Sequence, residues 1–386
     1  MRKVLDMSGL PNSAMSLDAV VDHAAHGISL VNSTIGGVRS TAPILEWGYL
    51  FGSSRSESDD THRTNAAGSF LNSEQAPWDE PTGQLHRAEC SYRIADFKTA
   101  RSQASKLLDS SDRSLALSAL VMHFASCIAM GNSESAYEDF LELKARCGTG
   151  FGCEDDSVHR MTSILVAMRV ESLMVLQVFD IPELEGGLSG FPRGWESYLG
   201  FLMAQRAMRG GNSGRAAGIS EAFLMLDGNR NPLSRILLLL AIASACMMLG
   251  EVGEAERSFR KAWELGQANG VIAPFVELNF SLLGLSRRCL LPNEASEYRR
   301  LETMVKTYYD GWYGLREKCG YHDKTRGLTP LESYVGGLVM LGWRNKAIAT
   351  HLRISENTVK HQLTAIYQKL GVSSRADLRN IMRQGR

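Results

Sequence analysis

The apolar residues between positions 86 and 300 return every three or four places, which is the spacing of one face of an α-helix. Glycines and alanines punctuate this pattern. One layout, a glycine followed by an alanine and then a phenylalanine, recurs three times: Gly131, Ala136 and Phe140; Gly211, Ala216 and Phe223; and Gly250, Ala255 and Phe259. A turning glycine and a small residue at a helix contact favour antiparallel helix pairs that stack into one core. The region 86–300 is therefore predicted to be helical.

These predicted helix pairs resemble tetratricopeptide repeats, whose glycine and small-residue positions they partly match. The signature tryptophan and the closing proline of that repeat are absent. An irregular helical bundle is the alternative architecture for the region, because a bundle needs no fixed repeat. Either architecture offers a surface for a protein or small-molecule effector rather than a site for catalysis.

Two regions flank the predicted helical body, and neither carries a catalytic motif. The first, residues 1–85, contains a stretch from 52 to 83 that is rich in Ser, Gly, Asn and Asp and has no sustained period. Such a composition predicts a flexible linker, and we assign this N-terminal region no function. The second, residues 301–327, is predicted to hold a connecting helix and a polar linker that starts at Gly320.

Helix-start and helix-stop signals divide residues 328–386 into four short helices. Thr329 and Glu332 have the spacing of a capping box, in which each side chain bonds the other residue's backbone N–H. Gly342 is predicted to end this first helix, and Asn345 to cap the second. Four helices in so short a segment, with a tight turn between the middle two, have the proportions of a helix-turn-helix domain.

The third of these helices sorts its side chains onto two faces. Ser355 is predicted to cap it and Gly371 to end it. Its apolar stripe is formed by Val359, Leu363, Ile366 and Leu370. Its outward face is polar and holds no carboxylate: Asn357, Lys360, His361, Thr364 and Gln368. Surface helices usually mix glutamate among their lysines, so this acid-free face favours contact with a polyanion.

The charge distribution supports the same interpretation. The whole chain has a formal charge of zero. Residues 328–386 hold nine Lys or Arg against three acids, a charge of +6, which leaves −6 on residues 1–327. A small basic unit on a larger acidic body indicates a polyanionic partner for the small unit alone.

The C-terminal unit resembles the LuxR-type helix-turn-helix domain of bacterial transcription regulators. The matching residues keep the family's order and spacing: Leu328, Thr329, Pro330 and Glu332; Gly342; Asn345, Lys346, Ile348, Ala349 and Leu352; Ile354, Ser355, Thr358, Val359 and Lys360; Ile366; and Lys369, Leu370, Gly371, Val372 and Arg375. The resemblance implies an all-α protein whose helical body, repeat-like or bundle, precedes a four-helix DNA-binding domain. It also implies double-stranded DNA as the partner and a homodimer on that DNA.

The resemblance implies a role for each residue that matches a position of the family motif. Lys360, His361 and Thr364 would face the major groove, where a lysine donates to guanine and a threonine contacts a thymine methyl group. Phosphate contacts, which fix register without reading sequence, fall to Lys346, Thr358 and Lys369, with Arg353 and Asn357 as further backbone candidates and Gln368 on the same outward face. The last helix would mediate dimerisation through Leu378, Ile381 and Met382, although packing onto the domain's own core is the alternative for these three.

Two residues depart from the family pattern. Gly336 stands where the family usually has a bulky leucine, and we expect it to loosen the first helix of the domain. Gln362 stands where the family commonly has a histidine, beside the residues that would face the major groove. The packing or hydrogen bonding next to Lys360 and Thr364 is therefore expected to differ from that of the family.

Several activities lack the residues that they need. No G-x-x-x-x-G-K-[ST] motif occurs, so the chain resembles only the C-terminal half of the large ATP-dependent LuxR regulators, without their ATPase. His23 and His26 have no third ligand nearby, and Cys147 and Cys153 fit a loop better than a metal site. We therefore expect no enzymatic activity, no cofactor and no metal.

Cysteine usage and hydropathy indicate the compartment. Seven cysteines with no C-x-x-C pair are typical of a reducing cytoplasm. The most apolar stretch, from Ile236 to Gly250, is shorter than the roughly 20 residues that span a bilayer, so a buried helix is expected there and no membrane partner.

The leading hypothesis is a cytoplasmic, sequence-specific DNA-binding regulator of transcription whose helical body receives a protein or small-molecule signal. The alternative is a protein-interaction scaffold whose C-terminal domain no longer binds DNA. The departures at Gly336 and Gln362 are the features that motivate this alternative.

Overall fold

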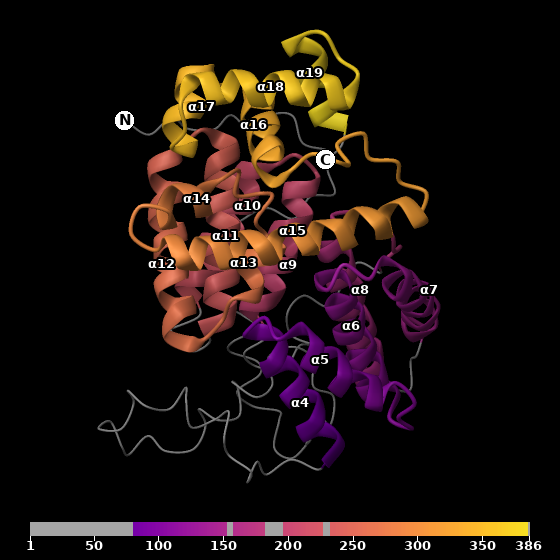
Figure 1. Ribbon diagram of the computed structural model, residues 1–386. Coiled ribbons are helices and arrows are strands. Elements are labelled where there is room, and N and C mark those ends of the chain that lie inside the picture. The colour runs from indigo at the N-terminus through magenta and orange to yellow at the C-terminus, as the bar shows by residue number, and fades with distance from the viewer. Residues whose placement is uncertain (1–79, 153–156, 182–195, 227–231, 385–386) are drawn as a thin grey trace, which may run out of the picture.

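The computed structural model describes residues 80–152, 157–181, 196–226 and 232–384. Every regular element in these ranges is a helix, and no strand occurs among the described residues, which confirms the predicted all-α class (Figure 1). The first helix of the described residues begins at Glu80, ahead of the predicted start of the helical body at 86. The rest of the predicted N-terminal region, including His23 and His26, lies outside the described residues.

The body is assembled from antiparallel helix pairs joined by short turns. The paired helices are α4 (Glu80–Arg93) with α5 (Phe97–Ala104), α6 (Arg113–Ala129) with α7 (Ser133–Gly150), α9 (Glu196–Arg209) with α10 (Ser213–Leu226), and α11 (Pro232–Leu249) with α12 (Val252–Asn269). A 3₁₀ turn, Ser105–Leu107, follows α5, and the unpaired α8 (Ser157–Met174) packs against α6, α7 and α9. The described part of the region 86–300 is thus helical as predicted, while its assignment as a tetratricopeptide-like repeat stays a prediction.

The recurrent glycines turn the chain within three of these pairs. Gly131, Gly211 and Gly250 have φ angles of 76°, 74° and 80°, the left-handed region that a residue without a Cβ adopts at least cost. The alanine that follows each glycine in the sequence pattern lies on the next helix and is fully buried in all three pairs. The small side chain lets the partner helix approach closely, which is the packing role that the pattern predicted.

The most apolar helix of the body, α11, passes through its centre. Pro232–Leu249 is long and apolar enough to cross a membrane by length and composition, yet 78% of that window is buried inside the protein. It packs between α12 and the pair α9 and α10. The apolar surface of α11 is therefore covered by protein, as expected for a core helix.

A long helix, α15 (Ala295–Lys318), crosses the body after the short helices α13 (Ala273–Glu277) and α14 (Leu285–Leu290). Figure 1 shows it running along one side of the molecule, from α12 to α7. Near its C-terminal end, Trp312 Nε1 donates to the Leu173 carbonyl at 2.9 Å, and Arg316 donates to the Met174 carbonyl at 2.8 Å. Both carbonyls end α8, so α15 caps a helix that lies far from it in sequence.

The C-terminal domain consists of α16 (Pro330–Met340), α17 (Asn345–Leu352), α18 (Glu356–Leu370) and α19 (Arg375–Gln384). Figure 1 places these four helices at one end of the body, next to α14. The domain is not separated from the body, because α17 contacts α14 and α16 contacts α15.

Candidate nucleic-acid interface

The first helix of the domain starts with the predicted capping box. Thr329 Oγ1 accepts from the Glu332 backbone N–H at 3.3 Å, and Glu332 Oε2 accepts from the Thr329 N–H at 2.6 Å. The same carboxylate oxygen lies 2.7 Å from Lys369 Nζ, which also donates to the Gly327 carbonyl at 3.1 Å. Lys369, a predicted phosphate contact, therefore already neutralises a buried glutamate, and a DNA phosphate would share its ammonium group.

The predicted recognition helix, α18, presents its polar face to solvent. Ser355 Oγ accepts from the Thr358 N–H at 2.9 Å, so Ser355 caps the helix, and Gly371 ends it with a φ of 64°. Val359, Leu363 and Ile366 of the apolar stripe are buried, while Leu370 is half-buried. The outward side chains of the predicted reading face are exposed: Asn357, Lys360, His361, Thr364 and Gln368. No acid lies among these five residues, and the one acid of α18, Glu356, is exposed in its first turn, so the structure brings together a hydrogen-bonding surface with Lys360 as its lysine.

Two further residues of α18 lie on or beside the reading face. Thr364 Oγ1 donates to the Lys360 carbonyl at 3.1 Å, so its hydroxyl is bonded to the backbone of α18. Gln362, the departure from the family pattern, is half-buried beside this face. It therefore lies at the border of the exposed surface rather than in its centre.

The turn between α17 and α18 holds another predicted backbone contact. Arg353 has a φ of 52°, one of the few left-handed non-glycine residues in the described chain. Its side chain is exposed, but its Nε donates to the Arg288 carbonyl of the body at 3.0 Å. Arg353 is therefore oriented by the body and not only by the turn.

The start of α17 differs from the prediction. Arg344, not Asn345, occupies the N-cap position, and no side chain caps this helix. The prediction was wrong because Asn345 has another partner: its side-chain oxygen accepts from Arg375 at 2.9 Å, and Arg375 also donates to the Trp343 carbonyl. Arg375 thus ties α19 to the turn before α17, a role that the family match did not reveal. Lys346, in the first turn of α17, is exposed.

The glycine that departs from the family pattern does not leave a void. A Cβ on Gly336 would lie 2.9 Å from the sulfur of Met382 and 3.0 Å from its terminal carbon. Met382 of α19 therefore fills the space of the missing side chain, which suits an unbranched, flexible residue. The expectation that Gly336 loosens α16 is therefore wrong, because Gly336 is buried and closely covered by Met382.

The residues proposed for dimerisation lie mostly inside the domain. Leu378 is fully buried and Met382 is 6% exposed, whereas Ile381 is half-buried. Leu378 and Met382 pack onto the domain's own core, which was the alternative to dimerisation, because α19 lies against α16 of the same chain. A dimer contact on α19 would therefore use Ile381 and the exposed residues next to it.

The joint between body and domain was not foreseen from the sequence. Arg287 Nε donates to the Leu352 carbonyl at 2.8 Å, and Arg288 donates to the Thr350 carbonyl at 3.4 Å. Two arginines of α14 therefore cap the C-terminal carbonyls of α17, a position where helix ends favour cations. His351, also in this turn of α17, lies 3.0 Å from the Leu283 carbonyl through its Nε2.

Apolar packing and a buried hydrogen bond complete the joint. A Cβ on Gly284 would lie 2.4 Å from a methyl carbon of Leu352, and Gly284 has a φ of 84°. Glycine is therefore required twice, for the turn and for the close approach. Tyr334 of α16 donates through its hydroxyl to Asn279 of the body, and both side chains are buried.

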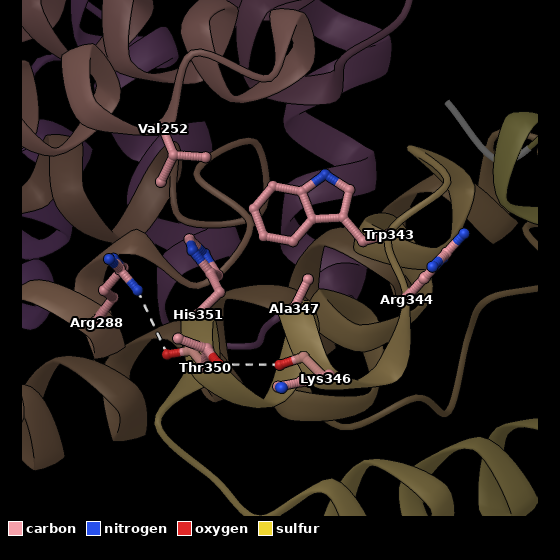
Figure 2. A pocket seen from close by; sticks show the side chains of 8 residues that line it. All are labelled: Val252, Arg288, Trp343, Arg344, Lys346, Ala347, Thr350 and His351. Atoms are coloured by element: carbon pink, nitrogen blue, oxygen red, sulfur yellow. Dashed lines mark hydrogen bonds between the residues drawn. The ribbon is translucent and has the colours of Figure 1, made fainter.

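A groove of about 460 Å³ runs along this joint. Figure 2 shows Val252 and Arg288 of the body on one side and Trp343, Lys346 and Thr350 of the domain on the other. Lys346, a predicted phosphate contact, is therefore one of the residues that line this groove.

Comparison with known proteins supports the assignment of the domain. Residues 326–382 match the family described as bacterial regulatory proteins, luxR family. Over 55 residues the chain is 46% identical to the probable transcriptional regulatory protein SgaR of Hyphomicrobium methylovorum, a match that covers 14% of this chain and 26% of that protein. No solved structure matches the chain. At its C-terminus, the chain carries a helix-turn-helix domain of the luxR family of bacterial regulatory proteins.

Proposed function

We propose that this protein is a sequence-specific DNA-binding regulator of transcription that acts in the cytoplasm as a homodimer on double-stranded DNA. The observation that carries the proposal is the exposed, acid-free face of α18 within a luxR-family domain. Lys360, His361 and Thr364 would read base edges, since they are exposed on the helix that follows the turn. Lys346 and Thr358 would contact phosphates on either side of it.

The test uses the full chain and distinguishes residues that recognise DNA bases from residues that contact the DNA phosphate backbone. DNA ligands are selected from a random pool with the wild-type protein, and affinity is measured by fluorescence anisotropy over a series of salt concentrations. Lys360→Ala should weaken binding to the selected sequence by about 1–3 kcal/mol and relax the preference at one base pair. Lys346→Ala should weaken selected and random DNA alike and make the salt slope shallower by about one unit.

Lys306→Ala on α15, an exposed lysine far from this domain in sequence, is the matched control and should change neither affinity nor slope. Absence of salt-dependent DNA binding by the wild-type chain would leave the scaffold alternative standing. Equal effects of Lys360→Ala and Lys346→Ala on sequence preference would contradict the division of roles.

We further propose that a protein or small-molecule signal acts through the joint between the body and the DNA-binding domain. The docked body binds Arg353 through the Arg288 carbonyl and supplies Val252 and Arg288 to the groove that Lys346 also lines. Because Lys346 lines this groove, a DNA backbone bound to it would lie close to Val252 and Arg288 of the body, and we infer that release of the domain from the body improves access. A signal that binds better to the undocked body would shift the population toward it.

The variant Tyr334→Phe tests this regulation, because it removes one hydroxyl from the joint and leaves the reading face unchanged. Loss of a buried hydrogen bond of about 1 kcal/mol predicts a several-fold gain in DNA affinity of the full chain. Tyr313→Phe removes a hydroxyl that contacts Thr325 of the linker, outside the contacts of α16 and α17 with the body, and serves as the control. Unchanged DNA affinity in Tyr334→Phe, with faster hydrogen exchange in α17, would show that docking does not limit DNA binding.

A further inference from the structure

Three different metal-ligating side chains meet inside the body, between α6 and α7. His123 and Cys127 are one helical turn apart on α6, so both project from the same face, and Asp139 reaches them from α7. All three are buried, with Cys127 fully inaccessible. His123 Nδ1 lies 2.7 Å from Asp139 Oδ2 and 3.7 Å from Cys127 Sγ, and the three ligand atoms lie within 4.8 Å of one another.

We propose that this cluster is a binding site for a divalent cation of the zinc class. Thiolate sulfur, imidazole nitrogen and carboxylate oxygen are the ligands of that ion, with bonds of about 2.0–2.3 Å. In a tetrahedral arrangement, such bonds place neighbouring ligand atoms about 3.3–3.7 Å apart. The contact of 3.7 Å between Cys127 and His123 already has this spacing. The contact of 2.7 Å between His123 and Asp139 has to widen by roughly 0.6–1.0 Å.

The charges of the three ligands match a divalent cation. Without metal, the cluster holds the Cys127 thiol, neutral His123 and the Asp139 carboxylate. When the ion binds, the thiol proton leaves to solvent, and the His123 proton moves from Nδ1 to Nε2. Binding therefore releases one proton, and the thiolate and carboxylate together neutralise the two charges of the ion. A water molecule would supply the fourth ligand.

One residue competes with the ion. Arg101 Nε donates to His123 Nε2 at 3.2 Å, which fixes the tautomer that donates from Nδ1 to Asp139. Because the metal-bound tautomer carries its proton on Nε2, Arg101 has to turn away when the ion binds. Arg101 is only half-buried, so its guanidinium can move into solvent. The side chain acts as a positioning residue that opposes metal binding, and its replacement should strengthen the site.

The experiment uses the full chain stripped with a chelator and then loaded with Zn²⁺ or Co²⁺. We expect one equivalent of Zn²⁺ per chain by elemental analysis, and a thiolate-to-Co²⁺ charge-transfer band with intense tetrahedral d–d bands. Cys127→Ser should abolish the charge-transfer band, and Asp139→Asn should weaken binding. Cys147→Ser changes a buried thiol on α7 that is not part of the cluster, and should leave both readouts unchanged.

Arg101→Gln distinguishes a metal site from a buried hydrogen-bond network. Its amide oxygen can accept from Nε2–H of a metal-bound His123, and partners of this kind change metal affinity about 10-fold or more. Tighter Zn²⁺ binding in Arg101→Gln would support the site even if Cys127→Ser fails to fold. A wild-type chain that binds no stoichiometric Zn²⁺, or a charge-transfer band that persists in folded Cys127→Ser, would overturn the proposal. The DNA-binding proposal does not depend on this result.

Discussion

The buried histidine at the joint makes the stability of the protein dependent on pH. His351 is 2% exposed, its Nε2 faces the Leu283 carbonyl, and its Nδ1 has no hydrogen-bond partner in the described structure. Burial lowers the pKa of His351 to about 4, with a smaller contribution from Arg288 in the same direction. Protonation would place a charge and an unpaired donor on Nδ1 in this dry environment.

The sign and size of the effect follow from linkage. The folded pKa lies below the ordinary value of 6.5, so the unfolded chain takes up the proton first as the pH falls. Stability is complete above about pH 6.5 and is lost progressively toward pH 4, by about 3 kcal/mol in total. Between about pH 7.5 and pH 5 the loss from this one group is about 2 kcal/mol.

The assay compares the wild type with His351→Gln by urea unfolding at both pH values. Glutamine can donate from its amide nitrogen toward the Leu283 carbonyl but does not titrate. The variant is therefore less stable at the higher pH through lost packing, yet its pH-dependent loss should be smaller by about 2 kcal/mol. His86, whose pKa burial also lowers to about 4, titrates in both proteins and cancels in the comparison. An equal pH-dependent loss in the two proteins would refute the reasoning.

Two further predictions concern glycines at close contacts. Gly336→Leu should destabilise the DNA-binding domain by about 1–3 kcal/mol through overpacking against Met382. Combining it with Met382→Ala should cost less than the sum of the two single changes in a double-mutant cycle by denaturation, whereas additivity would show that the residues do not share one space. Gly311→Ala places a Cβ 2.2 Å from the Ile128 carbonyl oxygen, which is backbone and cannot yield, and should cost about 1–3 kcal/mol or more in thermal unfolding. Its control, Gly218→Ala in the middle of α10, meets nothing within 4 Å and should stabilise by roughly 0.5–1 kcal/mol; a loss of stability there would contradict the steric argument.

Local signals allowed the elements of the DNA-binding domain to be predicted. The capping box at Thr329, the cap at Ser355 and the stop at Gly371 each act within a few residues, so the sequence alone determines them. The apolar stripe of α18 similarly depends only on helical period. The prediction at Asn345 was wrong because the position of its side chain is determined by Arg375, which comes from another helix.

The same distinction explains the two departures from the family pattern. In the sequence, Gly336 indicates only that a large side chain is missing from α16. The packing of α19 shows that Met382 fills the space of that side chain. The periodicity of α19 identifies Leu378 and Met382 as one apolar face. It does not say whether that face meets a second copy or the domain's own core, because both choices bury the same surface.

The joint illustrates the limit of position-based assignment of DNA contacts. Arg353 and Lys369 match family positions, and their charges suit phosphates, but each already binds a group in this chain: the Arg288 carbonyl and the Glu332 carboxylate. A phosphate contact by either residue replaces an existing interaction, so its net contribution is smaller than that of a free cation. The exposed side chain of Lys360 lies on the outward face of α18. A phosphate contact by Lys360 therefore replaces no interaction with another helix of the described residues. Substitution of Lys360 should therefore reduce DNA affinity more than substitution of Arg353 or Lys369, even though all three carry the same charge.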